Sequence, residues 1–116
     1  MNVTVKARQS VLERDGGMCM HCATTEALTI QHRANRGMGG DKAGRRNNLA
    51  NLITLCHESN VRLEADAMFA ARGIRKGWKL RSTDDATSIP VFHAGYGEWW
   101  LLNEEGGRQA IGTEMF

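Results

Sequence analysis

The fold of this chain is decided by residues 28–64, which read LTIQHRANRGMGGDKAGRRNNLANLITLCHESNVRLE. Apolar and polar residues alternate over residues 28–32, a period of two that is typical of a β-strand. A second apolar run over residues 52–55 predicts a strand that can pair with the first. After it, apolar positions recur at helical spacing, and Gly73 is expected to end that helix. The stretch therefore predicts two strands followed by a helix over residues 57–72.

The segment between the two predicted strands, residues 33–48, is rich in glycine and in basic residues. Its four glycines oppose regular structure. It is not a phosphate-binding P-loop, because it lacks the GK[ST] ending and does not run into a helix at the right place. Five basic side chains are candidates for contacts with a phosphate backbone: Arg33, Arg36, Lys42, Arg45 and Arg46. The alternative interpretation is a polar surface loop without a ligand.

Charge is distributed unevenly, although the formal net charge is only +2. Residues 31–81 carry eleven Lys or Arg against four Asp or Glu, whereas residues 82–116 carry one basic residue against six acidic ones. A basic centre attracts a polyanion through steering and counterion release. An ordinary solvated surface is the alternative, and charge alone does not decide between the two.

The size and composition of the chain predict one small domain over residues 1–116. The chain has 116 residues, of which 41% are hydrophobic. A chain of this length buries roughly two thirds of its unfolded surface. We expect the domain's core at about residues 19–72 and an extension at about 78–105. The first ten residues contain no apolar signal segment, and no run approaches the ~18 apolar residues of a membrane span. These features predict a soluble, cytoplasmic protein with no membrane contact.

Short elements are expected on both sides of the deciding stretch. Residues 6–14 predict a helix that ends at a pair of glycines. Residues 77–82 predict a short strand, and residues 91–94 and 99–103 predict two more around a Gly-Tyr-Gly turn. The three tryptophans are expected in the core or at its edge rather than as a base-stacking platform, because the tail around them is acidic. The fold class is therefore α+β.

The three cysteines are candidates for a metal site. Cys19 and Cys22 form a C-x-x-C pair, whose spacing allows both sulfurs to bind one tetrahedral zinc ion. Cys56 is the third candidate ligand, and the same spacing would place the fourth at Ser59. Two histidines, His21 and His57, could take its place. In the alternative interpretation the cysteines are small buried hydrophobic residues; a redox pair is disfavoured because no βαβ pattern surrounds them.

The deciding stretch also contains the residue types that metal-assisted phosphodiester hydrolysis requires. This chemistry needs a base that activates water and a cation at the developing charge. His32 lies at the end of the first predicted strand and Asn51 just before the second. Asn60 and Glu64 are four residues apart, so they are expected on one face of the predicted helix.

Together these motifs resemble the HNH (His-Asn-His) endonuclease family, in particular its small bacteriophage members. The resemblance covers most of the chain and rests on these motifs in order: VLERDGGMCMHC, QHRANRGMGGD, NLANLITLC, RKGW and PVFHAGYGEWWLLNEEGG. It implies a ββα-metal core with an N-terminal helix and a C-terminal hairpin. By this match His32 would be the general base, Asn51 would brace the loop and orient the histidine, and Asn60 would be a metal ligand on the helix.

The chain departs from the family pattern at three positions. Gln31 stands where members usually have His or Asp, and Asn60 replaces the final His, which makes an H-N-N variant suited to Mg²⁺ or Mn²⁺. Both amides are neutral, so Glu64 or a phosphate group of DNA would have to supply charge. Ser59 replaces a cysteine in the second half of the zinc site.

The function implied is a metal-dependent DNA endonuclease or nickase. Members of this group often work beside the terminase in genome packaging, so phage packaging proteins are expected as partners alongside DNA. The first alternative is an HNH fold that has lost cleavage and serves as a DNA-binding or packaging-accessory module, which Gln31 favours. The second is a zinc-ribbon module that binds a protein partner.

Overall fold

The computed structural model describes residues 3–34 and 48–113, which form an α+β fold with two small antiparallel sheets. The elements in chain order are α1 (Val5–Arg14), β1 (Leu28–His32), the 3₁₀ turn η2 (Leu49–Asn51), β2 (Leu52–Cys56), α2 (His57–Ala65), α3 (Ala67–Lys76), β3 (Val91–His93), β4 (Glu98–Leu102) and β5 (Arg108–Thr113). Within these residues, no helix has the length and apolar character needed to cross a bilayer.

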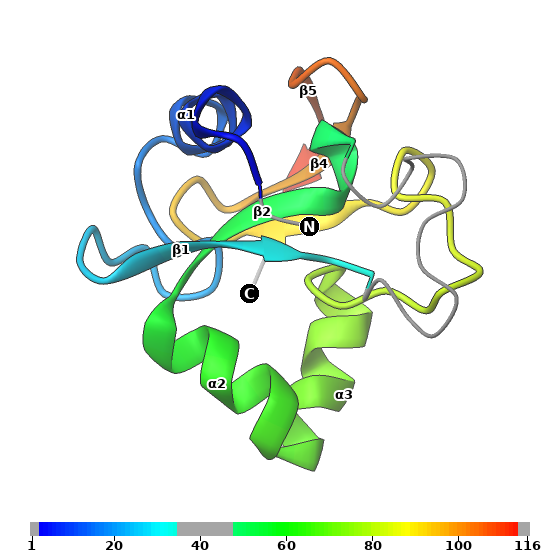
Figure 1. Ribbon diagram of the computed structural model, residues 1–116. Coiled ribbons are helices and arrows are strands. Elements are labelled where there is room, and N and C mark those ends of the chain that lie inside the picture. The colour runs from blue at the N-terminus through cyan, green and yellow to red at the C-terminus, as the bar shows by residue number, and fades with distance from the viewer. Residues whose placement is uncertain (1–2, 35–47, 114–116) are drawn as a thin grey trace.

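The two strands predicted from the deciding stretch pair as an antiparallel hairpin. Leu28 lies opposite Cys56, and His32 lies opposite Leu52. Every residue of β2 is buried, whereas those of β1 are half-buried, so β2 is the inner strand. Helix α1 lies on one side of this hairpin and α2 on the other (Figure 1).

Helix α1 forms as predicted and begins one residue earlier than expected. The hydroxyl of Thr4 accepts a hydrogen bond from the backbone N–H of Ala7 at 3.0 Å, which caps the first turn. After the helix, Gly16 and Gly17 have φ values of 77° and 68°. The left-handed conformation is readily adopted by glycine and ends the helix at the predicted place.

The prediction of one helix over residues 57–72 is wrong, because the chain forms two helices. Asp66 is extended, and its carboxylate accepts hydrogen bonds from the N–H groups of Met68 and Phe69 at 3.0 and 3.1 Å. An aspartate that caps a new helix ends the previous one. Gly73 also does not end a helix: it lies inside α3, where a Cβ would be 2.5 Å from Leu63 of α2. The glycine therefore allows the two helices to pack closely.

The second sheet has the order β3-β4-β5 and contains both strands predicted near the C-terminus. The strand expected over residues 77–82 does not form; Leu80 instead makes an isolated bridge to Ala34. Strand β5 was not predicted and lies beyond the expected extension. All six of its residues are exposed, so its sequence carries no alternation between a buried and an exposed face.

The tryptophans belong to the core, as predicted. Trp78 and Trp100 are fully buried, and Trp99 packs against the same cluster. The indole N–H of Trp78 donates to the carbonyl of Phe92 at 2.8 Å, so its polar atom is satisfied inside the core.

A buried ion pair joins the end of α1 to the hairpin. The Nε of Arg14 donates to the Asp15 carboxylate at 2.7 Å, and both side chains are almost completely buried. The guanidinium also donates to the carbonyls of Leu49 and Leu52, and the backbone N–H of Thr54 donates to Asp15. Each charge is thus compensated by several hydrogen bonds, which buried ions require.

His93, the last residue of β3, is buried, and its ring bonds to Asp15, the residue that follows α1. The N–H of Gly95 donates to its Nδ1 at 3.0 Å, so Nε2 carries the proton and donates to the Asp15 carbonyl at 2.8 Å. Burial is the main effect on the pKa of His93 and lowers it from its ordinary value. The native state therefore favours the neutral imidazole.

We expect acid to destabilise the protein through His93. As the pH falls below the ordinary histidine pKa of about 6.5, the unfolded chain takes up a proton that the native state resists, so stability decreases. The measurement is the melting temperature at pH 7 and pH 5 for the wild type and for His93→Gln, which cannot titrate there. The decrease should be smaller in the variant, and an equal decrease in both proteins would contradict the assignment.

Candidate functional site

Three cysteines form a cluster that can hold a metal ion. Their Sγ atoms lie within 4.8 Å of one another, and those of Cys22 and Cys56 are 3.8 Å apart. Cys19 and Cys22 come from the turn after α1, whereas Cys56 ends β2. In the described residues this is the one group of three or more His, Cys, Asp or Glu side chains placed to bind an ion together.

Backbone N–H groups point at the sulfur atoms of this cluster. The N–H of His21 donates to Cys19 Sγ and that of Ser59 to Cys56 Sγ, each at 3.4 Å. Cys56 is also the N-cap of α2, where the helix dipole favours negative charge.

The pKa values of two thiols are shifted in opposite directions. Cys22 is exposed as a residue, but neighbouring groups exclude part of the water from its sulfur, and this desolvation raises the pKa of the thiol to about 11. At Cys56 burial also acts upward, but hydrogen bonds from the hydroxyl and N–H of Ser59 outweigh it and lower the pKa. Cys56 is therefore the more easily ionised of these two, and a bound cation would favour the thiolate form of each.

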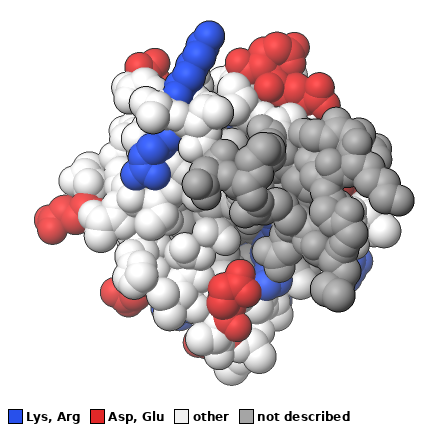
Figure 2. All heavy atoms as spheres, viewed as in Figure 1, with Lys and Arg blue, Asp and Glu red and all other residues white. Residues whose placement is uncertain are grey.

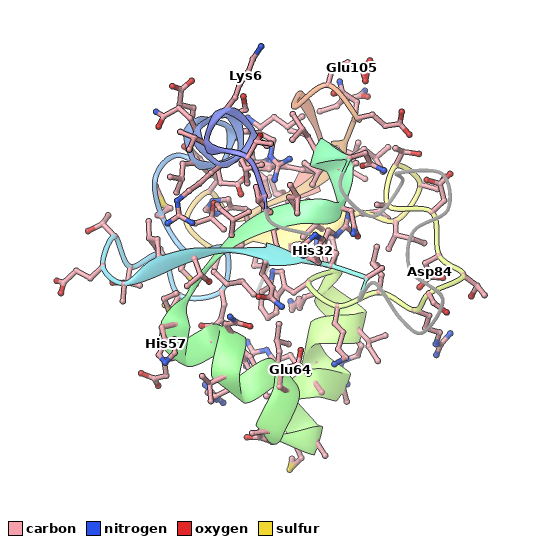
Figure 3. All side chains as sticks on the ribbon, viewed as in Figure 1. Lys6, His32, His57, Glu64, Asp84 and Glu105 are labelled. Carbon is pink, nitrogen blue, oxygen red and sulfur yellow. The ribbon has the colours of Figure 1, made fainter. Side chains whose placement is uncertain are left out.

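The two residues considered for a fourth ligand besides Ser59 lie in different surroundings. His21 is half-buried, and its ring packs edge-on against Phe69 and Trp78, with centroids 4.7 and 5.2 Å away. Burial, followed by nearby arginines, lowers the pKa of His21, so the ring is held neutral. His57 is exposed on the first turn of α2 (Figure 3).

The second candidate site is the end of the hairpin that carries His32. His32 is the last residue of β1 and is half-buried, as are Gln31 beside it and Asn60 on α2. Glu64 follows Asn60 by one helical turn and is exposed. In the view of Figure 3, Glu64 lies on α2 below the end of β1 that carries His32.

Asn51 holds the chain immediately after this end of β1. Its side-chain oxygen accepts from the N–H of Ala34 at 2.8 Å, and its side-chain nitrogen donates to the Ala34 carbonyl at 3.2 Å. The N–H of Arg33 donates to the Asn51 carbonyl at 2.7 Å. A buried amide with both ends bonded to one residue fixes the direction in which the chain leaves the strand.

The expectation that Arg33 contacts a phosphate backbone is wrong. The side chain is 1% exposed and donates to four backbone carbonyls, those of Ala50, Gly77, Ala86 and Ile89, at 2.8–3.0 Å. Burial, and secondarily Arg14, lowers its pKa to about 9, so the group remains charged at neutral pH. Arg33 therefore connects the hairpin to the segments after α3 and does not face a ligand. Nothing in its sequence context distinguishes it from the other basic residues.

The remaining predicted phosphate contacts lie outside the described residues: Arg36, Lys42, Arg45 and Arg46. On the face drawn in Figure 2, the described Lys and Arg side chains are scattered among acidic ones and do not gather into one patch.

Comparison with known proteins gave no match for this chain among family models, curated proteins or solved structures.

Proposed function

We propose that this protein is a metal-dependent DNA endonuclease or nickase of the HNH type. The observation that carries the proposal is the order and connection of β1, β2 and α2. Cys56 ends β2 and caps α2, so the helix follows the hairpin without a linker. His32 stands at the end of β1, and Asn51 holds the next part of the chain through Ala34. The candidate base His32, the asparagine that fixes the chain after it and a helix with oxygen donors thus come from one ββα unit.

In the proposed mechanism His32 acts as the general base. Its imidazole takes a proton from a water molecule, which then attacks phosphorus in line with the leaving 3′ oxygen; such base catalysis contributes typically about 10²- to 10⁴-fold. Asn60, with Gln31 or Glu64, would hold Mg²⁺ or Mn²⁺ through the oxygen donors that these ions prefer, and the ion would supply positive charge at the phosphate. Asn51 keeps the chain after His32 in one position. The product would carry a 5′ phosphate, as the resemblance implies.

For the cysteine cluster we propose zinc in a structural role. Thiolates suit this ion, and three sulfurs from two separate segments would tie the turn after α1 to the end of β2. We further propose DNA as the substrate and phage packaging proteins as partners. The site of action would be the cytoplasm, that of the host cell if a phage encodes the protein.

We predict that His32→Ala abolishes nicking of a supercoiled plasmid while DNA affinity stays within a few-fold. The reason is that the base acts on water, whereas contacts with phosphate come from other residues. Nicking is measured in Mg²⁺ and in Mn²⁺ with EDTA as the blank, and DNA affinity is measured by a direct binding assay. His57→Ala is the matched control, because it removes an exposed histidine from the same unit. Loss of binding in step with loss of nicking would contradict this role.

A DNA-binding module without cleavage is the second candidate, favoured by the neutral amides at Gln31 and Asn60. A cation held by amides gains less electrostatic stabilisation than one held by a carboxylate. Gln31→Asp distinguishes the candidates: a nuclease should need less metal for half-maximal nicking, whereas activity that appears only in the variant would identify a decayed enzyme. A protein that binds zinc but neither binds nor cleaves DNA would support the protein-binding zinc module.

A further inference from the structure

The cysteine cluster contains three sulfurs, and a polar atom lies where a fourth ligand belongs. The hydroxyl oxygen of Ser59 is 3.2 Å from Cys56 Sγ and 3.6 Å from Cys19 Sγ. Ser59 is 3% exposed, so this hydroxyl is inside the protein beside the sulfurs. It belongs to the first turn of α2, which Cys56 caps.

These distances match the edges of a tetrahedral zinc site. Zn–S bonds of about 2.3 Å give S···S edges of about 3.8 Å, and a Zn–O bond of about 2.0 Å gives S···O edges of about 3.5 Å. The Cys22–Cys56 separation is 3.8 Å, and the two Ser59 distances of 3.2 and 3.6 Å lie on either side of the expected S···O value. Three of the six edges thus lie near the values of a tetrahedral site, and the remaining S···S edges are no longer than 4.8 Å.

The ring of His21 lies next to the Ser59 hydroxyl. Its Nδ1 is 2.9 Å from Ser59 Oγ, and its ring is held against Phe69 and Trp78. The group of mutually close ligand atoms contains the three thiols and no imidazole nitrogen, so His21 is placed as a partner of Ser59 rather than as a ligand. Without metal the hydroxyl is within hydrogen-bond distance of both Cys56 Sγ and His21 Nδ1. With an ion bound, it would donate its single hydrogen to Nδ1 and keep its oxygen lone pairs for the cation.

We propose that the metal centre has a Cys₃Ser ligand set, in which Ser59 Oγ binds the ion and His21 positions it. A neutral hydroxyl is a weak ligand, and an acceptor for its hydrogen makes the oxygen a better donor, as partners of ligands generally do. The inference rests on the proposed zinc site and is independent of DNA cleavage. It makes Ser59 a ligand in its own right and gives a function to a histidine that would otherwise be a packing residue.

The test uses Co²⁺ as a spectroscopic substitute for zinc, with affinity measured by competition against a chelator. The wild type should show thiolate-to-cobalt charge-transfer absorption for three sulfurs. Ser59→Cys should add a fourth sulfur, raise this absorption and tighten binding. Ser59→Ala should keep the three-sulfur absorption and bind about ten- to a hundredfold more weakly.

His21→Phe tests the positioning role, because it retains a ring against Phe69 and Trp78. It should weaken metal binding about ten- to a hundredfold in the wild-type background and leave affinity unchanged in the Ser59→Cys background, where a thiolate needs no acceptor. Circular dichroism of each variant with metal checks that it folds. The proposal is overturned if the wild type binds no metal, if Ser59→Ala matches the wild type, if Ser59→Cys adds no sulfur absorption, or if His21→Phe weakens both backgrounds equally. Nicking activity enters none of these outcomes, so failure here is distinct from failure of the proposed nuclease.

Discussion

Arg33→Ala is expected to lower the free energy of unfolding by about 4 kcal/mol or more, a large fraction of the ~5–15 kcal/mol that stabilises a small domain. The guanidinium donates to the carbonyls of Ala50, Gly77, Ala86 and Ile89, and it is 1% exposed. Removal takes a donor from four carbonyls at once, and each buried polar group left unsatisfied costs about 1–3 kcal/mol. It also leaves a cavity, because no other side chain fills the volume.

Urea unfolding of wild type and variant measures this effect. Arg33→Lys should recover a small part of the stability, since an ammonium cannot reproduce a planar fork of donors. Arg81→Ala removes an exposed arginine and should stay within about 0.5 kcal/mol of the wild type. If Arg33→Ala were as stable as Arg81→Ala but bound DNA more weakly, the structural role of Arg33 would be contradicted. The phosphate contact expected from the sequence would then be the better interpretation.

Cys19→Ser is expected to remove the bound ion and to lower the melting temperature by about 10 °C or more. Protein purified without added zinc should contain close to one zinc ion per chain, as measured by elemental analysis, and the variant should contain almost none. The cluster joins the turn after α1 to the start of α2, so metal binding in the native state adds directly to stability.

Cys22→Ser separates metal binding from core packing. Cys19 is buried, so its replacement disturbs the core as well, whereas Cys22 is exposed. If an ion carries the effect, Cys22→Ser should lose zinc and melt at a similarly reduced temperature, and EDTA should bring the wild type to the same value. Thr25→Ser, an exposed change in the same turn, serves as the control. Wild-type protein that is free of zinc and melts unchanged in EDTA would disprove the site.

The hairpin and the start of α2 could be predicted from sequence because their signals are local. Alternation over residues 28–32 and the apolar run before Cys56 each require one buried face, and both strands form where expected. The break at Asp66 was missed because the apolar spacing continues across it; a capping aspartate inside a helical pattern was the available signal. Gly73 was misread because its role depends on Leu63 of another helix. A contact between two helices cannot be predicted from the sequence of one of them.

The candidate site could be predicted in part for the same reason. The spacing of Cys19 and Cys22 brings two thiols together within one turn, and Cys56 joins them through the strand pairing. The position of Ser59 followed from the same spacing, but its contact with His21 depends on how the turn packs against α3. Arg33 was expected to contact phosphate because composition does not distinguish a buried arginine from an exposed one. Its four carbonyl partners come from segments 17 to 56 residues away, which sequence pattern does not bring together.

Both ends of the connection over residues 35–47 are anchored by the same asparagine. Asn51 binds both backbone polar groups of Ala34 on one side, and its own N–H is held by Asn48 on the other. The frame that contains His32 is therefore closed independently of how many residues the connection contains. In general, doubling the length of a loop adds only about 0.6 kcal/mol to the entropic cost of closing it. Evolution or a designer could therefore exchange this segment for one of different length and charge while the frame stays the same.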